Sequence, residues 1–156
     1  MAFKTGSGTI QRFFSITPQT LELSFTGNTN SAETANFNSN VSTSATHVLC
    51  DIFVTRSTSD HQNYMFGRSG QVGNHQNWVN TRGDRPSSVF ANMGANVIIL
   101  TSNGENDGYA DNYGLWYSSQ MMPTSGRTFY WNNYGNSGSN GYIFIKYRGY
   151  YESEGN

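Results

Sequence analysis

Short apolar runs alternate along this chain with clusters of Asn, Gly, Ser and Thr, a pattern typical of strands joined by turns. Within several runs, apolar and polar residues alternate one by one. This period of two, with one polar face, predicts antiparallel strands that bury a single face. The predicted strands are 9–16, 20–26, 34–38, 46–56, 63–68, 76–80, 87–92, 95–102, 113–118, 127–132 and 141–150.

The alternation also predicts which side chains of three strands form the core. The expected inward sets are Leu21, Leu23 and Phe25; Val48, Cys50, Ile52 and Val54; and Ile143, Ile145 and Tyr147. The opposite, outward sets are Glu22 and Ser24; Asp51; and Phe144, Lys146 and Arg148. The number and spacing of strands predict an all-β fold, an antiparallel β-sandwich of jelly-roll type with about ten short strands.

The polar, low-complexity segment 27–46 fits either an exposed edge hairpin or a long loop. No linker or shift in composition divides the chain, so we expect a single domain over residues 1–156. Asn, Ser, Gly and Thr supply 70 of the 156 residues, and residues that favour strands outnumber those that favour helices by 52 to 37. We therefore do not expect a helical bundle.

The charge balance argues against two classes of binding partner, nucleic acids and membranes. The net charge is −1, and only 12% of residues are charged. A nucleic-acid-binding protein needs a basic face, and attraction to anionic membranes needs basic clusters. We expect neither partner, nor insertion into a membrane, because the apolar runs are only about four residues long. The N-terminal stretch also lacks the apolar core of a signal peptide.

Candidate catalytic and metal-binding chemistry is sparse. Cys50, the single cysteine, lies in a strong strand pattern, so we expect a buried apolar residue and no disulfide. His47, His61 and His75 are too widely spaced for a zinc site. No nucleophile elbow or phosphate-binding glycine motif occurs. We therefore expect no enzyme activity, no cofactor and no metal, although the oxygen-rich segment 103–116 leaves a calcium site open.

Segment 68–86 is the first candidate ligand-binding loop. It combines amide-rich turns with Trp78, Arg82 and Arg85. An indole gives a flat apolar surface for stacking, and arginine forms planar, bidentate contacts to carboxylate and phosphate groups. We predict that Trp78 stacks on a sugar and that Arg82 and Arg85 bind anionic groups. The alternative is a surface loop held by contacts among its own arginines and Asp84.

Segment 103–116 is the second candidate loop. It contains Asp107, Asp111, Asn112 and Trp116 among glycines. A sugar has one apolar face and a rim of hydroxyl groups, so its binding site needs an aromatic plane and short polar side chains. We predict that Trp116 stacks on the sugar and that Asp107, Asp111 and Asn112 accept or donate hydrogen bonds to hydroxyls. A solvated turn is the alternative.

Several segments together resemble the β-rich receptor-binding head domains of tailed-phage fibres. The residues that carry this resemblance are 48–55, 66–68, 77–83, 105–109, 113–116 and 133–142. The resemblance implies a homotrimeric virion-surface protein, extracellular to the host, that binds a cell-surface glycan or lipopolysaccharide. Such fibres carry a long N-terminal shaft, so the chain fits a separate tip subunit, a decoration protein or an excised domain.

The aromatic residues favour assembly or binding beyond what one core requires. All three Trp and all ten Tyr lie from Tyr64 onward. We expect several of them to be exposed or to lie between subunits, most simply of a homotrimer. Two other functions stay open: a purely structural capsid or tail decoration protein, and a sandwich lectin outside any virus.

Overall fold

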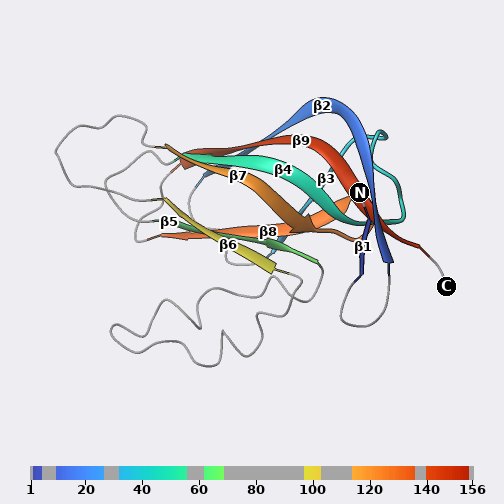
Figure 1. The fold of residues 1–156 in the computed structure, drawn as a ribbon. Coiled ribbons are helices and arrows are strands. Elements are labelled where there is room, and N and C mark those ends of the chain that lie inside the picture. The colour runs from blue at the N-terminus through green and yellow to red at the C-terminus, as the bar shows by residue number, and fades with distance from the viewer. Residues whose placement is uncertain are drawn as a thin grey trace.

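Two antiparallel β-sheets make up the regular structure of this protein. The computed structural model describes residues 2–4, 10–26, 32–55, 62–68, 97–102, 114–135 and 140–154, and no helix occurs among them. The five-stranded sheet has the order β1 (Ala2–Lys4), β2 (Ile10–Thr26), β9 (Asn140–Glu154), β4 (Ala45–Thr55), β7 (Gly114–Pro123). The four-stranded sheet has the order β3 (Glu33–Asn36), β8 (Thr128–Gly135), β5 (Gln62–Gly67), β6 (Val97–Ser102). The sheets lie face to face as a β-sandwich (Figure 1).

The predicted all-β, antiparallel fold is therefore confirmed, and the strand boundaries differ in an informative way. The predicted strands 9–16 and 20–26 form one continuous strand, β2, whose pairing with β9 shifts register between Ser15 and Gln19. Pro18 lies within this shift, where a missing backbone N–H costs no ladder hydrogen bond. The predicted strands 76–80 and 87–92 lie outside the described residues.

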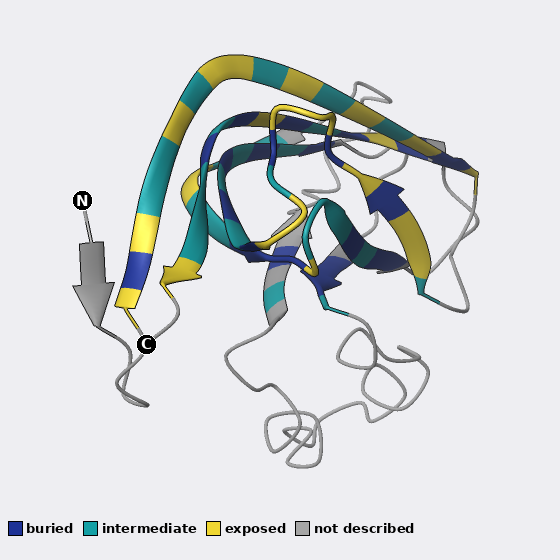
Figure 2. Ribbon diagram, turned by 90° about the vertical axis from the view of Figure 1, so that its right-hand side faces the viewer, coloured by how far each residue is buried: buried dark blue, intermediate teal, exposed yellow. Residues whose placement is uncertain are grey.

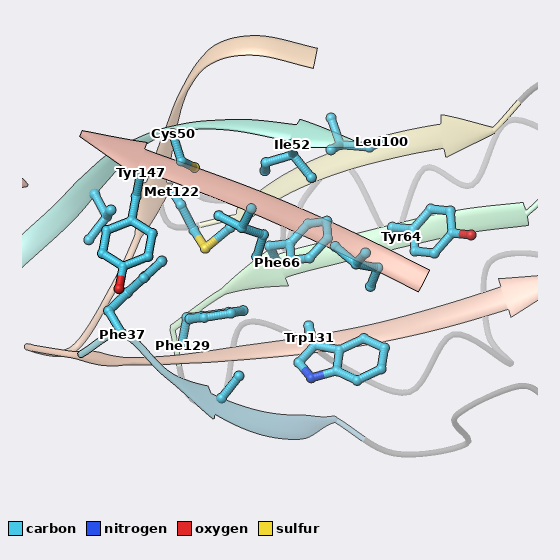
Figure 3. Packing of buried hydrophobic residues seen from close by; sticks show 14 of the residues in the cluster. Phe37, Cys50, Ile52, Tyr64, Phe66, Leu100, Met122, Phe129, Trp131 and Tyr147 are labelled. Atoms are coloured by element: carbon cyan, nitrogen blue, oxygen red, sulfur yellow. The ribbon is translucent and has the colours of Figure 1, made fainter. Parts of the chain in front are cut away.

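The core lies between the two sheets and follows the predicted alternation. Val48, Cys50, Ile52 and Val54 of β4 and Ile143, Ile145 and Tyr147 of β9 are buried. They face Tyr64 and Phe66 of β5 and Phe129 and Trp131 of β8 (Figure 3). Buried and more exposed residues alternate along β4 and β9, whereas residues 64–67 of β5 and 131–133 of β8 are buried on both faces (Figure 2). The five-stranded sheet thus presents one apolar face to the core and a second face outward.

The polar segment 27–46, which the structure describes from residue 32 onward, contains both an edge strand and a loop. Its strand β3 lies at the edge of the four-stranded sheet and pairs with β8. The residues that follow form a loop whose Phe37 and Val41 are buried. The Phe37 ring lies 4.7 Å from the ring of Tyr147, and the Arg127 Nε donates to the carbonyl of Val41 at 2.6 Å. The segment therefore combines an edge strand with a loop that closes one end of the core.

Candidate functional site

Of the seven predicted ligand-binding residues, the structure describes one, Trp116. The others, Trp78, Arg82, Arg85, Asp107, Asp111 and Asn112, lie outside the described residues, and their roles stay predictions.

Trp116 belongs to strand β7, which overlaps the predicted strand 113–118, and it also stands at the end of the candidate loop 103–116. Its neighbours Leu115 and Tyr117 pack against the core, so the indole points to the outer face of the five-stranded sheet. There it is 63% exposed. Strand β7 is the last strand of the five-stranded sheet as described, so no described strand pairs with its outer edge. This is the exposure that a stacking residue needs.

Trp116 is the first ring of a continuous row on that outer face. Phe53 of β4 pairs with Trp116 in register, and their ring centroids are 4.7 Å apart. Phe144 of β9 pairs with Phe53 on its other side, with 6.1 Å between centroids. Tyr142, which is 49% exposed, stacks on Phe144 at 6.2 Å with an interplanar angle of 27°. We call these four residues the aromatic row.

The aromatic row is built by alternation and by antiparallel register together. Phe53 lies between the buried Ile52 and Val54, and Phe144 lies between the buried Ile143 and Ile145. Each ring must therefore point away from the core. Strands β7, β4 and β9 are neighbours in the sheet (Figure 1). Their register places the rings beside one another across the three strands. Cross-strand aromatic pairs of this kind contribute about 0.2–1 kcal/mol each.

A polar cluster lies next to the aromatic row on the same face. Asp51, two residues before Phe53, accepts a hydrogen bond from the backbone N–H of Ser119 at 2.7 Å. Its other oxygen accepts from Arg148 Nη1, also at 2.7 Å, and Arg148 Nη2 donates to the Ser119 hydroxyl at 2.8 Å. Asp51, Ser119 and Arg148 thus close a triangle from three strands, which we call the polar cluster.

Ser119 occupies a β-bulge in the edge strand. Cys50 pairs with Gln120 and Ile52 pairs with Tyr117, so two residues of β7 oppose one residue of β4. Ser119 has a φ of 54°, the left-handed region that favours glycine. Such a conformation costs of order 1–3 kcal/mol in a non-glycine residue and persists where surrounding contacts hold it. Two hydrogen bonds hold Ser119 here: its backbone N–H donates to Asp51, and its hydroxyl oxygen accepts from Arg148 Nη2.

The electrostatics of the polar cluster keep both partners charged. The hydrogen bonds from Arg148 and from the Ser119 backbone lower the pKa of Asp51, and Asp51 raises the pKa of Arg148. Lys146, exposed and in register with Asp51, lowers the pKa of Asp51 further. Glu22 lies on the other side, in register with Phe144. Among the described residues, the charged groups beside the aromatic row therefore balance, two of each sign.

Groups that could support catalysis or metal binding are few in the described part of the chain. Cys50 is fully buried, as predicted, and burial raises its pKa to about 12, so the thiol is not a nucleophile near neutral pH. Burial and the Arg68 guanidinium lower the pKa of His47. Within the described ranges, no group of three His, Cys, Asp or Glu side chains could hold a metal ion, and no helix is long and apolar enough to cross a membrane.

Most of this face was not predicted from the sequence. Alternation placed Asp51, Phe144, Lys146 and Arg148 on outward faces, but no function was expected of them. The alternation around Phe53 and Phe144 was the available signal, because a large aromatic residue opposite a buried set must lie on the solvent side. No signal in the sequence identifies the pairing of Asp51 with Arg148, which lie 97 residues apart.

Comparisons with known proteins add no family to this picture. No family model matches the chain, and no curated protein matches its sequence. Function is therefore inferred from the outer face itself.

Proposed function

We propose that this chain is a carbohydrate-binding protein whose ligand stacks on the aromatic row. The observation that supports the proposal most is Trp116, a large indole that is 63% exposed yet fixed in place by the Phe53 ring 4.7 Å away. Exposing so much apolar surface is unfavourable without a partner. A sugar ring is a suitable partner, because its C–H face is apolar and its edge carries hydroxyls.

The groups around the aromatic row favour a sugar over a purely apolar partner. The polar cluster begins within two residues of Phe53, and Lys146 and Glu22 are exposed beside Phe144. Side chains of this kind can donate to and accept from hydroxyl groups. A purely apolar partner would leave them without hydrogen bonds when it excluded water, at a cost of about 1–3 kcal/mol for each group.

We further propose that the sandwich is a jelly roll, as the sequence predicted. The support is the nesting of its strand pairs: β2 with β9, β3 with β8, β4 with β7, and β5 with β6. Nested pairs are produced when one long antiparallel ribbon folds over itself. The pairs β4 with β9 and β5 with β8 then join the turns of the ribbon into two sheets. Jelly rolls are frequent in viral capsid and lectin domains.

This architecture agrees with a receptor-binding role at the surface of a virion, which stays our proposal together with the homotrimer. Some of the aromatic residues that seemed to exceed one core are in fact part of it, among them Tyr64, Trp131 and Tyr147. Trp116 and Tyr142 are exposed and stay available for a ligand.

A structural decoration protein is the competing function, and the same rings distinguish it. In that case the aromatic row would pack against a second copy of the chain and would be unavailable to sugars. We expect light scattering to give the mass of a trimer at micromolar concentration, and Trp116→Ala to leave that mass unchanged. A trimer that dissociates in Trp116→Ala would place the row at the subunit interface and would support the structural function.

The direct test is a glycan array probed with the wild-type protein and two variants. Losing a central stacked Trp costs about 2 kcal/mol or more at a binding site, so Trp116→Ala should weaken binding more than about thirtyfold. Ile10→Ala is the matched control, because Ile10 is also a large exposed apolar residue, 42% exposed, at the other end of β2 from Glu22. Equal binding by both variants, or no glycan bound by the wild type, would overturn the proposal.

A further inference from the structure

We infer that the ligand of the aromatic row is an uncharged glycan and that the polar cluster binds its hydroxyl groups. This inference rests on the proposed function and narrows it, because it selects the class of sugar and adds Asp51, Ser119 and Arg148 to the site. It also differs from the expectation of anionic ligands, which depended on Arg82 and Arg85.

The polar cluster has hydrogen-bonding capacity beyond its internal contacts. A guanidinium has five N–H donors, and the hydrogen bonds to Asp51 and Ser119 use two of those of Arg148. A carboxylate offers about four acceptor sites, and the same cluster uses two of those of Asp51. The side chains of Arg148 and Asp51 are 35% and 26% exposed, so both groups keep contact with solvent. One donor fork and one acceptor fork side by side match two adjacent sugar hydroxyls.

The geometry of the polar cluster is fixed before a ligand arrives. Three hydrogen bonds of 2.7–2.8 Å join β4, β7 and β9, and the bulge at Ser119 is stabilised by two of them. Side chains held in this way lose little conformational entropy when they bind. The bulge also follows Trp116 by three residues in the same strand, so the polar groups stand beside the stacking surface.

Charge neutrality selects uncharged sugars. Arg148 is neutralised by Asp51 at 2.7 Å, so it offers donors without a net positive charge. Lys146 and Glu22 have opposite signs: Lys146 lies two residues from Phe144 along β9, and Glu22 lies beside Phe144 on the neighbouring strand β2. Because these four charges sum to zero, an acidic glycan would gain little net attraction at this face, and its carboxylate or sulfate would lose water beside Asp51 and Glu22 as well as beside Lys146. Uncharged hydroxyls meet no such cost.

Two substitutions separate binding of hydroxyls from a structural role of the polar cluster. Ser119→Gly removes the hydroxyl but suits the positive φ, so the bulge should persist without strain. Asp51→Asn keeps an oxygen acceptor for the Ser119 N–H but leaves the Arg148 charge unbalanced. If the cluster binds hydroxyls, both variants should fold and should bind uncharged glycans about three- to tenfold more weakly, as expected when one or two hydrogen bonds are lost. Asp51→Asn should in addition gain affinity for acidic glycans.

The experiment uses an array of oligosaccharides in which each uncharged member has a sulfated or sialylated counterpart. Binding of the wild type is compared at about 0.01 M and about 1 M salt, which shortens the Debye length from about 30 Å to about 3 Å. We expect binding to the uncharged members, with an affinity that changes less than about twofold between these salt concentrations. Acidic members should bind more weakly than their counterparts.

Three results would overturn the inference. Preference for acidic members, with affinity that falls steeply with salt and still depends on Trp116, would contradict the uncharged ligand but leave the proposed function intact. Wild-type affinity in folded Ser119→Gly and Asp51→Asn would show that the polar cluster only shapes the bulge. Absence of binding to every member would overturn this inference and the proposed function together.

Discussion

Replacing Trp131 and Trp116 separately with alanine should change stability by very different amounts. Trp131 belongs to β8, is 2% exposed and lies 6.1 Å from the Phe25 ring in the core. Trp116 belongs to β7, is 63% exposed and contacts Phe53 on the outer face. The two side chains have identical chemistry, so any difference between the two variants reports their surroundings.

The size of each effect follows from what the indole leaves behind. Removing the buried indole of Trp131 opens a cavity between the sheets, and substitutions of this kind cost about 3–5 kcal/mol. That is a large part of the 5–15 kcal/mol by which native domains are typically stable. Removing Trp116 opens no cavity and loses one cross-strand aromatic pair, which contributes about 0.2–1 kcal/mol.

Urea unfolding followed by far-ultraviolet circular dichroism measures both values. All proteins are compared at the same chain concentration, because an assembly would make stability depend on concentration. At equal slopes, Trp131→Ala should move the midpoint far to lower urea, and Trp116→Ala should barely move it. A cost above about 2 kcal/mol for Trp116→Ala would refute the reasoning, because it would show that the indole is buried and unavailable for stacking.

The remaining predictions concern a close contact and the pH dependence of stability. Gly149→Ala should lower the free energy of unfolding in urea by about 1–3 kcal/mol. The new Cβ would lie 2.7 Å from the Phe14 carbonyl oxygen, which cannot move away as a side chain can. An unchanged urea midpoint would contradict this packing. Because the folded state lowers the pKa of His47 below 6.5, the unfolded chain binds more protons there, so the melting temperature should fall as pH decreases from about 6.5. The melting temperature of His47→Gln should fall less than that of the wild type, and an identical pH profile would contradict this account. Asp51, whose pKa is also lowered on folding, adds a second loss of stability only as pH falls below 3.8.

The local pattern of the sequence was sufficient to predict which side chains form the core. Alternation placed Cys50, Ile52 and Ile145 inward, and all three are buried. This works because successive side chains of a strand point to opposite faces, whatever the strand's partners are. The same argument failed to join 9–16 with 20–26, because Pro18 resembles a strand end in sequence while in the structure it lies in a bulged part of β2.

The outer face could not be predicted because it depends on register between distant strands. Trp116 meets Phe53 through the pairing of β7 with β4, and Phe53 meets Phe144 through the pairing of β4 with β9. A shift of one residue in either pairing would turn these rings away from one another. The bulge at Ser119 adds a second unpredictable step, since a non-glycine residue with positive φ has no signature in the sequence.

The central claim is that a glycan binds the outer face of the five-stranded sheet along the aromatic row. Titrating an isotope-labelled protein with an uncharged oligosaccharide from the array, followed by nitrogen–proton correlation spectra, locates the bound sugar directly. We predict that the largest shifts fall on the indole N–H of Trp116 and on the backbone N–H groups of Phe53, Phe144 and Ser119. Saturable shifts confined to other residues, with these four signals unmoved, would contradict the claim.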